Sequence, residues 1–218
     1  MQRYVDNLLA DAGVTGVGES LVIRNAGSIT THGVGAHGMF VETLSGTGAA
    51  GRDGCFFCGE PSAGGPGANG AGIEVTHDGS IVTDGVGSIG IFALSRGGTG
   101  GRGGEGSTWY SGRAGGRGGD GGDLVVDGGG SISTGADDAI GILAISEGGI
   151  GGYGGEGVGF TSGARGGVGG NAGDVRVEGS FDIRTAGVGA HAIWGKSVGG
   201  SGGTGGSAGW IGIGRAHV

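Results

Sequence analysis

Proline, cysteine and aromatic residues are scarce in this sequence of 218 residues, which contains two prolines, two cysteines and 6% aromatic residues. Collagen combines glycine at every third position with abundant proline. The shortage of proline therefore excludes a collagen triple helix, although 67 residues are glycine. Long apolar runs are missing as well. None approaches the roughly 18 residues that a membrane-spanning helix needs, so the sequence predicts no such helix.

Positive charge is also in short supply, with 12 Lys and Arg against 20 Asp and Glu and a formal net charge of −8. This balance argues against nucleic acids and anionic membrane surfaces as partners, because both attract positively charged proteins. Residues 1–16 lack a basic stretch followed by an apolar stretch. We therefore identify no export signal in this chain.

Glycine-rich sequences are often disordered, because they bury too little apolar surface to offset the loss of chain entropy on folding. Here, however, 35% of the residues are hydrophobic. The Ile, Leu and Val residues also recur at fixed positions along the chain, which is not typical of a disordered linker. The sequence therefore favours an ordered protein.

Four copies of one repeat organise the chain, and the third copy, residues 123–149, shows it most clearly. One isoleucine position recurs at spacings of 52, 51 and 51 residues: Ile29, Ile81, Ile132 and Ile183. We expect an N-terminal cap or short helix in residues 1–20 and a repeat solenoid over residues 21–218. The expected repeats are 21–72, 73–123, 124–174 and 175–218.

Within each repeat, apolar residues alternate with other residues, as in Ile73 and Val75 or Ile140 and Ile142. A period of two with β-branched residues is typical of short strands with one buried face. Four copies at one period predict an all-β fold, a parallel β-helix in which each repeat stacks on its neighbours. We expect the isoleucine position to form one ladder in it. Further ladders are expected from Phe40, Phe92, Leu143 and Trp194, from Thr31, Thr83, Thr134 and Thr185, and from Thr43, Ser95, Ser146 and Ser197.

Long glycine segments separate the repeats and follow a triplet pattern, Gly-Gly-X. Residues 97–122 run through such triplets to an aromatic tip and return through further triplets. A period of three suits the polyproline II helix, which has no internal hydrogen bonds. Glycine would let such segments lie side by side. We expect stacked out-and-back excursions beside the β-helix; the alternative is a structureless loop.

The phrases GSITTHGVGAHGMF, DGVGSIGIFALSRGGTGG and AGVGAHAIWGKSVGGSGG resemble repeats in the passenger regions of Gram-negative autotransporters. The resemblance covers residues 21–207. It implies a right-handed parallel β-helix, carried to the cell surface by a C-terminal barrel of outer-membrane strands. Passengers of this family include adhesins, enzymes and surface structural modules, and a scaffold does not imply a function.

On this basis we expect a non-catalytic structural or adhesive module that is secreted or displayed at the cell surface. One alternative is a fragment of a larger passenger whose enzymatic or glycan-binding activity lies outside this chain. Another is an unrelated glycine-rich structural protein. We identify no catalytic or cofactor-binding residue in the sequence.

Cys55 and Cys58 have the spacing of a redox motif, but such a motif belongs at the start of a helix that follows a strand. This pair lies at a glycine-segment tip, so a local disulfide is the expected state in an exported protein. Two cysteines alone are too few for a structural zinc site.

Gly118–Val126 matches a calcium-binding nonapeptide, in which Asp120 and Asp123 would supply oxygen ligands. The match is weak, because such sites need tandem nonapeptides and this pattern occurs once.

The aromatic tips are the candidate contact points for a host surface or glycans, although they could instead pack on one another. They comprise Trp109, Tyr110, Phe160 and Trp210. The fourth repeat has no glycine return, which would leave an open strand edge. Open edges template further pairing, so we also expect self-association through the open solenoid end.

Overall fold

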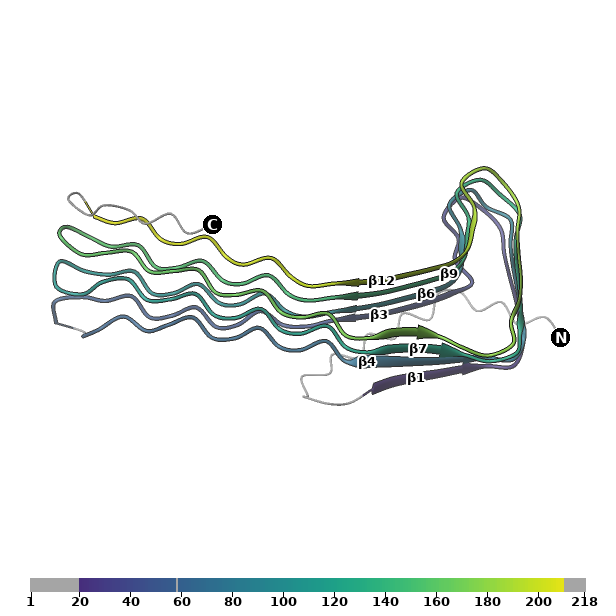
Figure 1. Ribbon diagram of the computed structural model, residues 1–218, viewed down its shortest axis with the longest axis horizontal. Helices are drawn as coiled ribbons and strands as arrows, with labels where there is room; N and C mark the ends of the chain where they lie inside the picture. Colours follow the sequence, from purple (N-terminus) through teal and green to yellow (C-terminus); the bar gives the residue numbers. More distant parts are fainter. Residues whose placement is uncertain (1–19, 58, 210–218) are drawn as a thin grey trace.

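The computed structural model describes residues 20–57 and 59–209, and this part of the chain is an all-β parallel solenoid with long glycine-rich excursions (Figure 1). It contains no helix, and hence none that could cross a membrane. Residues 1–19, which hold almost all of the expected N-terminal cap, lie outside the described residues, and Ser20 already belongs to the first strand. The strands are β1 (Ser20–Asn25), β2 (Ser28–Thr31), β3 (Met39–Leu44), β4 (Gly72–His77), β5 (Ser80–Thr83), β6 (Ile89–Arg96), β7 (Leu124–Asp127), β8 (Ser131–Thr134), β9 (Ile140–Glu147), β10 (Val175–Val177), β11 (Asp182–Thr185) and β12 (His191–Val198).

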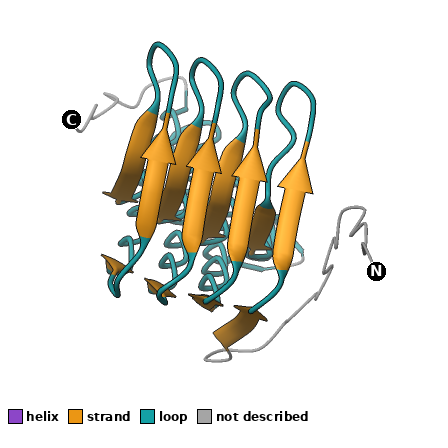
Figure 2. Cartoon of the chain, turned by 90° about the vertical axis from the view of Figure 1, so that its right-hand side faces the viewer, coloured by secondary structure: helices purple, strands orange, loops and turns teal. Residues whose placement is uncertain are grey.

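Each repeat contributes one strand to each of three parallel sheets (Figure 2). The sheet orders are β1-β4-β7-β10, β2-β5-β8-β11 and β3-β6-β9-β12. In the second sheet, Ile81 pairs with Ile29 on one side and Ile132 on the other, and Ile132 pairs with Ile183. The predicted isoleucine ladder is therefore confirmed, together with the stacking of the four repeats.

The core of the solenoid is a set of apolar ladders that point inward from the three sheets. Ile81, Val75 and Ile91 are completely buried, one from each sheet of the second repeat. Full burial of such a side chain stabilises the fold by about 1.5–3 kcal/mol. Thr83 and Thr134 are also buried, so the predicted threonine ladder lies inside the solenoid.

The predicted aromatic ladder also forms, since Phe40 pairs with Phe92, Phe92 with Leu143, and Leu143 with Trp194. It lies on the outer face of its sheet: Phe40 is 44% exposed and Trp194 is 49% exposed. The alternation of the strand explains this placement, because the flanking Met39 and Val41 point into the core. The Phe40 and Phe92 rings stack with their centroids 4.7 Å apart.

The predicted hydroxyl ladder joins the solenoid to the glycine segments. The Ser95 hydroxyl donates to the Ala71 carbonyl at 2.8 Å and accepts from the Gly122 amide at 2.9 Å. Ser146 makes the equivalent pair of hydrogen bonds one repeat later, to Gly122 and from Gly173. Each serine thus holds together two successive glycine segments where they reach the sheet.

The glycine segments form a slab that extends from one side of the solenoid, visible as the wavy traces at the left of Figure 1. We call residues 45–54, 97–106, 148–157 and 199–208 the outward segments, and residues 60–71, 111–122 and 162–173 the return segments. Hydrogen bonds recur at every third residue. The Gly97 amide bonds to Glu147 at the end of β9, and the Gly100 and Gly103 amides bond to the next outward segment. The amides of Gly98, Gly101 and Gly104 bond to the return segment before them. A period of three without hydrogen bonds inside a segment is that of the polyproline II helix. The excursions therefore run out and back and stack beside the solenoid, which is the first of the two arrangements that the triplets left open.

The slab needs glycine because its segments touch through their backbones. A Cβ atom on Gly100 would lie 2.0 Å from the Gly116 carbonyl oxygen, and one on Gly101 would lie 2.0 Å from that of Ala49. In the second and third outward segments, the first glycine of each triplet faces a return segment, the second faces the preceding outward segment, and X points away from both. Each triplet has two glycines because it makes two close backbone contacts, one with each neighbouring segment.

Candidate contact surface at the slab tips

The tips of the slab are closed turns that present their side chains at the end farthest from the solenoid. In the first repeat, Cys55 and Gly59 exchange backbone hydrogen bonds of 3.2 and 3.3 Å. In the second, the Ser107 amide donates to the Tyr110 carbonyl at 2.7 Å, and the Tyr110 amide donates back at 3.2 Å. In the third, the Thr161 amide donates to the Val158 carbonyl at 3.3 Å, supported by the Thr161 hydroxyl. The tip backbones are therefore held by local hydrogen bonds.

Aromatic rings gather on the first two tips. We call Phe56, Phe57, Trp109 and Tyr110 the aromatic tip. The Phe56 and Phe57 rings meet edge-on with their centroids 4.7 Å apart. The centroid of the Phe56 ring also lies 6.2 Å from that of Trp109, which belongs to the neighbouring repeat. Phe56, Trp109 and Tyr110 line a depression of about 450 Å³. The aromatic tip is thus a shared surface made by two repeats.

Most of this aromatic surface remains accessible despite the ring contacts. Phe57 is 94% exposed and Trp109 is 68% exposed, and Phe160 on the third tip is 78% exposed. The rings therefore touch one another and still face solvent. Phe56 and Phe57 were not predicted as contact residues. They lie at the tip of the first repeat, as Trp109 and Tyr110 lie at the tip of the second. This shared position in the repeat is the sequence signal that could have identified them as contact residues.

Cys55 is disulfide-bonded. The only other cysteine in the sequence is Cys58, which lies outside the described residues, as does Trp210. The disulfide-bonded Cys55 starts the tip turn that carries Phe56 and Phe57. It therefore belongs to the framework that holds these two rings in place.

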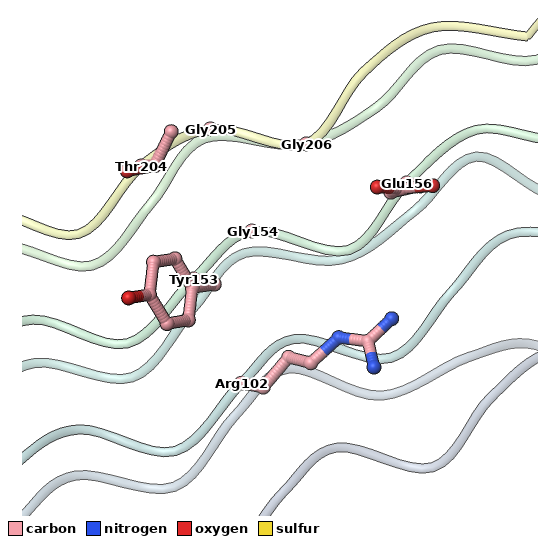
Figure 3. A pocket seen from close by; sticks show the side chains of 7 residues that line it. All are labelled: Arg102, Tyr153, Gly154, Glu156, Thr204, Gly205 and Gly206. Carbon is pink, nitrogen blue, oxygen red and sulfur yellow. The ribbon is translucent and has the colours of Figure 1, made fainter.

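A second hollow, of about 500 Å³, lies on the outer face of the slab (Figure 3). Its side chains come from X positions of three successive outward segments: Arg102, Tyr153, Glu156 and Thr204, with Gly154, Gly205 and Gly206 beneath them. Arg102 forms an ion pair with Glu105. One basic, one acidic and one aromatic side chain line the hollow. Its surface is therefore polar, with no excess of positive or negative charge.

The calcium candidates Asp120 and Asp123 bond to neighbouring repeats. Asp120 accepts from Arg117 at 2.5 and 3.1 Å and from the Asn171 amide at 2.6 Å, while its own amide donates to the Asn69 side chain. Asp123 accepts from the Asp174 amide at 2.8 Å. Within residues 20–57 and 59–209, no group of three or more His, Cys, Asp or Glu is placed to hold a metal ion. Both carboxylates link successive repeats by accepting hydrogen bonds from backbone amides of the next repeat.

The hydrogen bond from Arg117, together with that from the Asn171 amide, holds the pKa of Asp120 below its ordinary value of 3.8, although partial burial opposes this shift. A depressed carboxyl pKa stabilises the folded state above the ordinary pKa, and that stability is lost as the pH falls through the folded-state pKa. We therefore expect the stability advantage of the parent chain over Asp120→Asn, which keeps an acceptor for Asn171, to decline as the pH falls below about 4 and to vanish once the pH is below the folded-state pKa. Thermal melts of both chains at a series of pH values measure this, and a difference that is independent of pH would contradict it.

No protein-family model matches the sequence, and no curated protein matches it. Among solved structures, the chain is similar to a springtail antifreeze protein from Granisotoma rainieri, described as a bundle of nine polyproline type II helices. The two are 25% identical, the match covers 74% of this chain and 94% of that chain, and the TM-score is 0.20. At this TM-score the likeness carries no argument about fold or function.

Proposed function

We propose that this chain is a non-catalytic display module whose slab presents the aromatic tip to a binding partner. The observation that carries this proposal is the exposed Trp109, which lies against Phe56 of the neighbouring repeat at the far end of the slab. The segments behind it are joined by backbone hydrogen bonds at every triplet. A contact surface on such a support loses little conformational entropy on binding, which favours affinity.

The chemistry of the aromatic tip suits a glycan or a protein surface as partner. Exposed aromatic side chains supply large apolar contact areas and are enriched among the residues that dominate binding energies. The formal net charge of −8 disfavours nucleic acid. Glycans or other components of a host surface are therefore the partners that we propose.

We further propose that the module belongs to a surface passenger of the autotransporter type. The support comes from the repeat phrases described above and from the disulfide-bonded Cys55, because disulfides persist in oxidising compartments outside the cytosol. Antibody labelling of intact producing cells tests the location. Labelling only after the cells are permeabilised would contradict it.

For the contact function, Trp109→Ala is expected to lower binding about tenfold or more to whichever ligand the parent chain recognises on immobilised oligosaccharides or on cells. Trp194→Ala is the matched control, because Trp194 is also exposed but lies on β12, in the solenoid. The melting temperature should remain the same in both variants, since neither ring is buried. Equal loss of binding in the two variants, or undiminished binding by Trp109→Ala, would overturn the proposal.

A further inference from the structure

The depression at the aromatic tip is lined by three residues, all of them aromatic: Phe56 of the first repeat and Trp109 and Tyr110 of the second. Its volume of about 450 Å³ falls within the range of small-molecule sites, about 300–1,000 Å³. The planes of the Phe56 and Trp109 rings are tilted by 52°. Because the planes are not parallel, neither ring covers the face of the other. The depression therefore offers a ligand aromatic surface and little else.

Few hydrogen-bonding groups belong to the side chains that line this depression. Only the Tyr110 hydroxyl and the Trp109 indole nitrogen can form hydrogen bonds, and the indole nitrogen only donates. A polar group that gives up its bonds to water without finding new partners costs free energy. A sugar ring carries several hydroxyl groups, and most of them would find no side-chain partner inside the depression. The depression therefore suits a group of the partner that needs no hydrogen bond.

A quaternary ammonium group meets this requirement, because its nitrogen carries no hydrogen. Its positive charge is attracted to the electron-rich face of an aromatic ring, and most strongly to that of tryptophan. Several rings around one cation form the aromatic cages that recognise choline and methylated lysine groups. Phe56, Trp109 and Tyr110 give the depression this composition.

The charges next to the first two tips do not oppose a cation. Arg113 pairs with Glu60 at 2.6 Å, and Arg102 forms an ion pair with Glu105, so carboxylates balance both guanidinium groups. The Arg52 guanidinium donates to the Glu60 carbonyl at 3.4 Å. The chain as a whole has a formal net charge of −8. A negative net charge favours the approach of cations over that of anions.

From the three aromatic rings, the scarcity of hydrogen-bonding groups and the negative net charge, we infer that the depression binds a trimethylammonium group carried by the partner. This inference rests on the proposed function, because it names the chemical group of the partner that the aromatic tip contacts. The turns that carry the rings are closed by backbone hydrogen bonds, from Cys55 to Gly59 and from Ser107 to Tyr110. Rings held in this way lose little conformational entropy when the cation binds.

Choline is the probe for this site, added to the full chain and followed by the nuclear magnetic resonance signal of its methyl protons. These protons shift upfield when they lie over an aromatic face. The control ligand is the uncharged isostere of choline, in which a tert-butyl group replaces the trimethylammonium group. Choline should bind at least about fivefold more tightly than the isostere, because only a cation is attracted to the ring faces. Equal affinities, or the absence of saturable choline binding, would overturn the inference.

Trp109→Leu keeps an apolar side chain but removes the ring. It should weaken choline binding about fivefold or more and change the binding of the isostere less. Phe160→Leu is the matched control, because Phe160 is 78% exposed on the third tip and does not line the depression. Both variants should keep the parent melting temperature, since neither ring is buried. Undiminished choline binding by Trp109→Leu would contradict the inference, as would equal losses in the two variants.

Competition separates this inference from the proposed function. Choline should displace the surface ligand that the parent chain recognises. If Trp109→Ala loses that ligand while saturating choline does not displace it, the inference fails and the proposed function stands. If choline binds but Trp109→Ala still binds the surface ligand, the proposed function fails. Phosphocholine and a peptide containing trimethyl-lysine, as further probes, distinguish a choline-bearing surface from a modified protein as the source of the group.

Discussion

Gly151→Ala is expected to lower the free energy of unfolding by about 3 kcal/mol, whereas Gly202→Ala, the same position one repeat later, should change it by less than about 0.5 kcal/mol. The added Cβ atom at residue 151 would lie 2.0 Å from the Gly167 carbonyl oxygen, so the two segments must separate. Their separation strains the hydrogen bonds that join them, from the Gly167 amide to the Gly152 carbonyl and from the Gly170 amide to the Gly149 carbonyl, both 2.8 Å. Chemical denaturation of both variants measures the difference.

The pair of variants isolates the close backbone contact, because the two glycines share their sequence context and differ in what residues 20–57 and 59–209 place against them. Hydrogen exchange adds a local readout: the amides of Gly100 and Gly101 should be protected in the parent chain, since both are bonded to other segments. Equal destabilisation by the two substitutions would show that glycine acts here through the conformation of its own backbone. Fast exchange throughout residues 97–122 would show that the segments do not stay associated.

Ile81→Ala in the solenoid core is expected to cost about 4 kcal/mol, compared with less than about 1 kcal/mol for Val82→Ala beside it. Ile81 is completely buried between Ile29 and Ile132, so truncation leaves a cavity in the ladder. Val82 belongs to the same strand but points outward and is 39% exposed. Unfolding monitored by the far-ultraviolet signal of the strands compares the two variants.

A third variant in the same ladder tests the dependence on stacking. Ile183 stands at the end of the ladder and is only partly buried, so Ile183→Ala should cost less than Ile81→Ala. In a solenoid each repeat is stabilised by its nearest neighbours, and a terminal repeat has fewer of them. Equal losses at the two positions would contradict this account of the core.

The repeat in the sequence determined much of this fold. One isoleucine position at a spacing of 51 or 52 residues was enough to predict the ladder from Ile29 to Ile183, because identical residues stack when identical repeats do. Alternation predicted strands with one buried face, such as the one containing Ile73 and Val75. The Gly-Gly-X triplets predicted the out-and-back excursions, since a period of three is a property of one polyproline II helix by itself.

Outside the ladders, the contacts between repeats were decided by the tertiary structure alone, as was the face on which each ladder lies. The sequence did not predict that the ladder of Phe40 lies outside the solenoid, because a period of two defines two faces without saying which is buried. Nor did it bring Phe56 to Trp109, or Asp120 to Asn171, because these pairs meet only when one repeat lies on the next. The two glycines of a triplet look alike in the sequence. They differ in the slab, where each faces a different neighbouring segment, so the order of those segments gives each glycine its role.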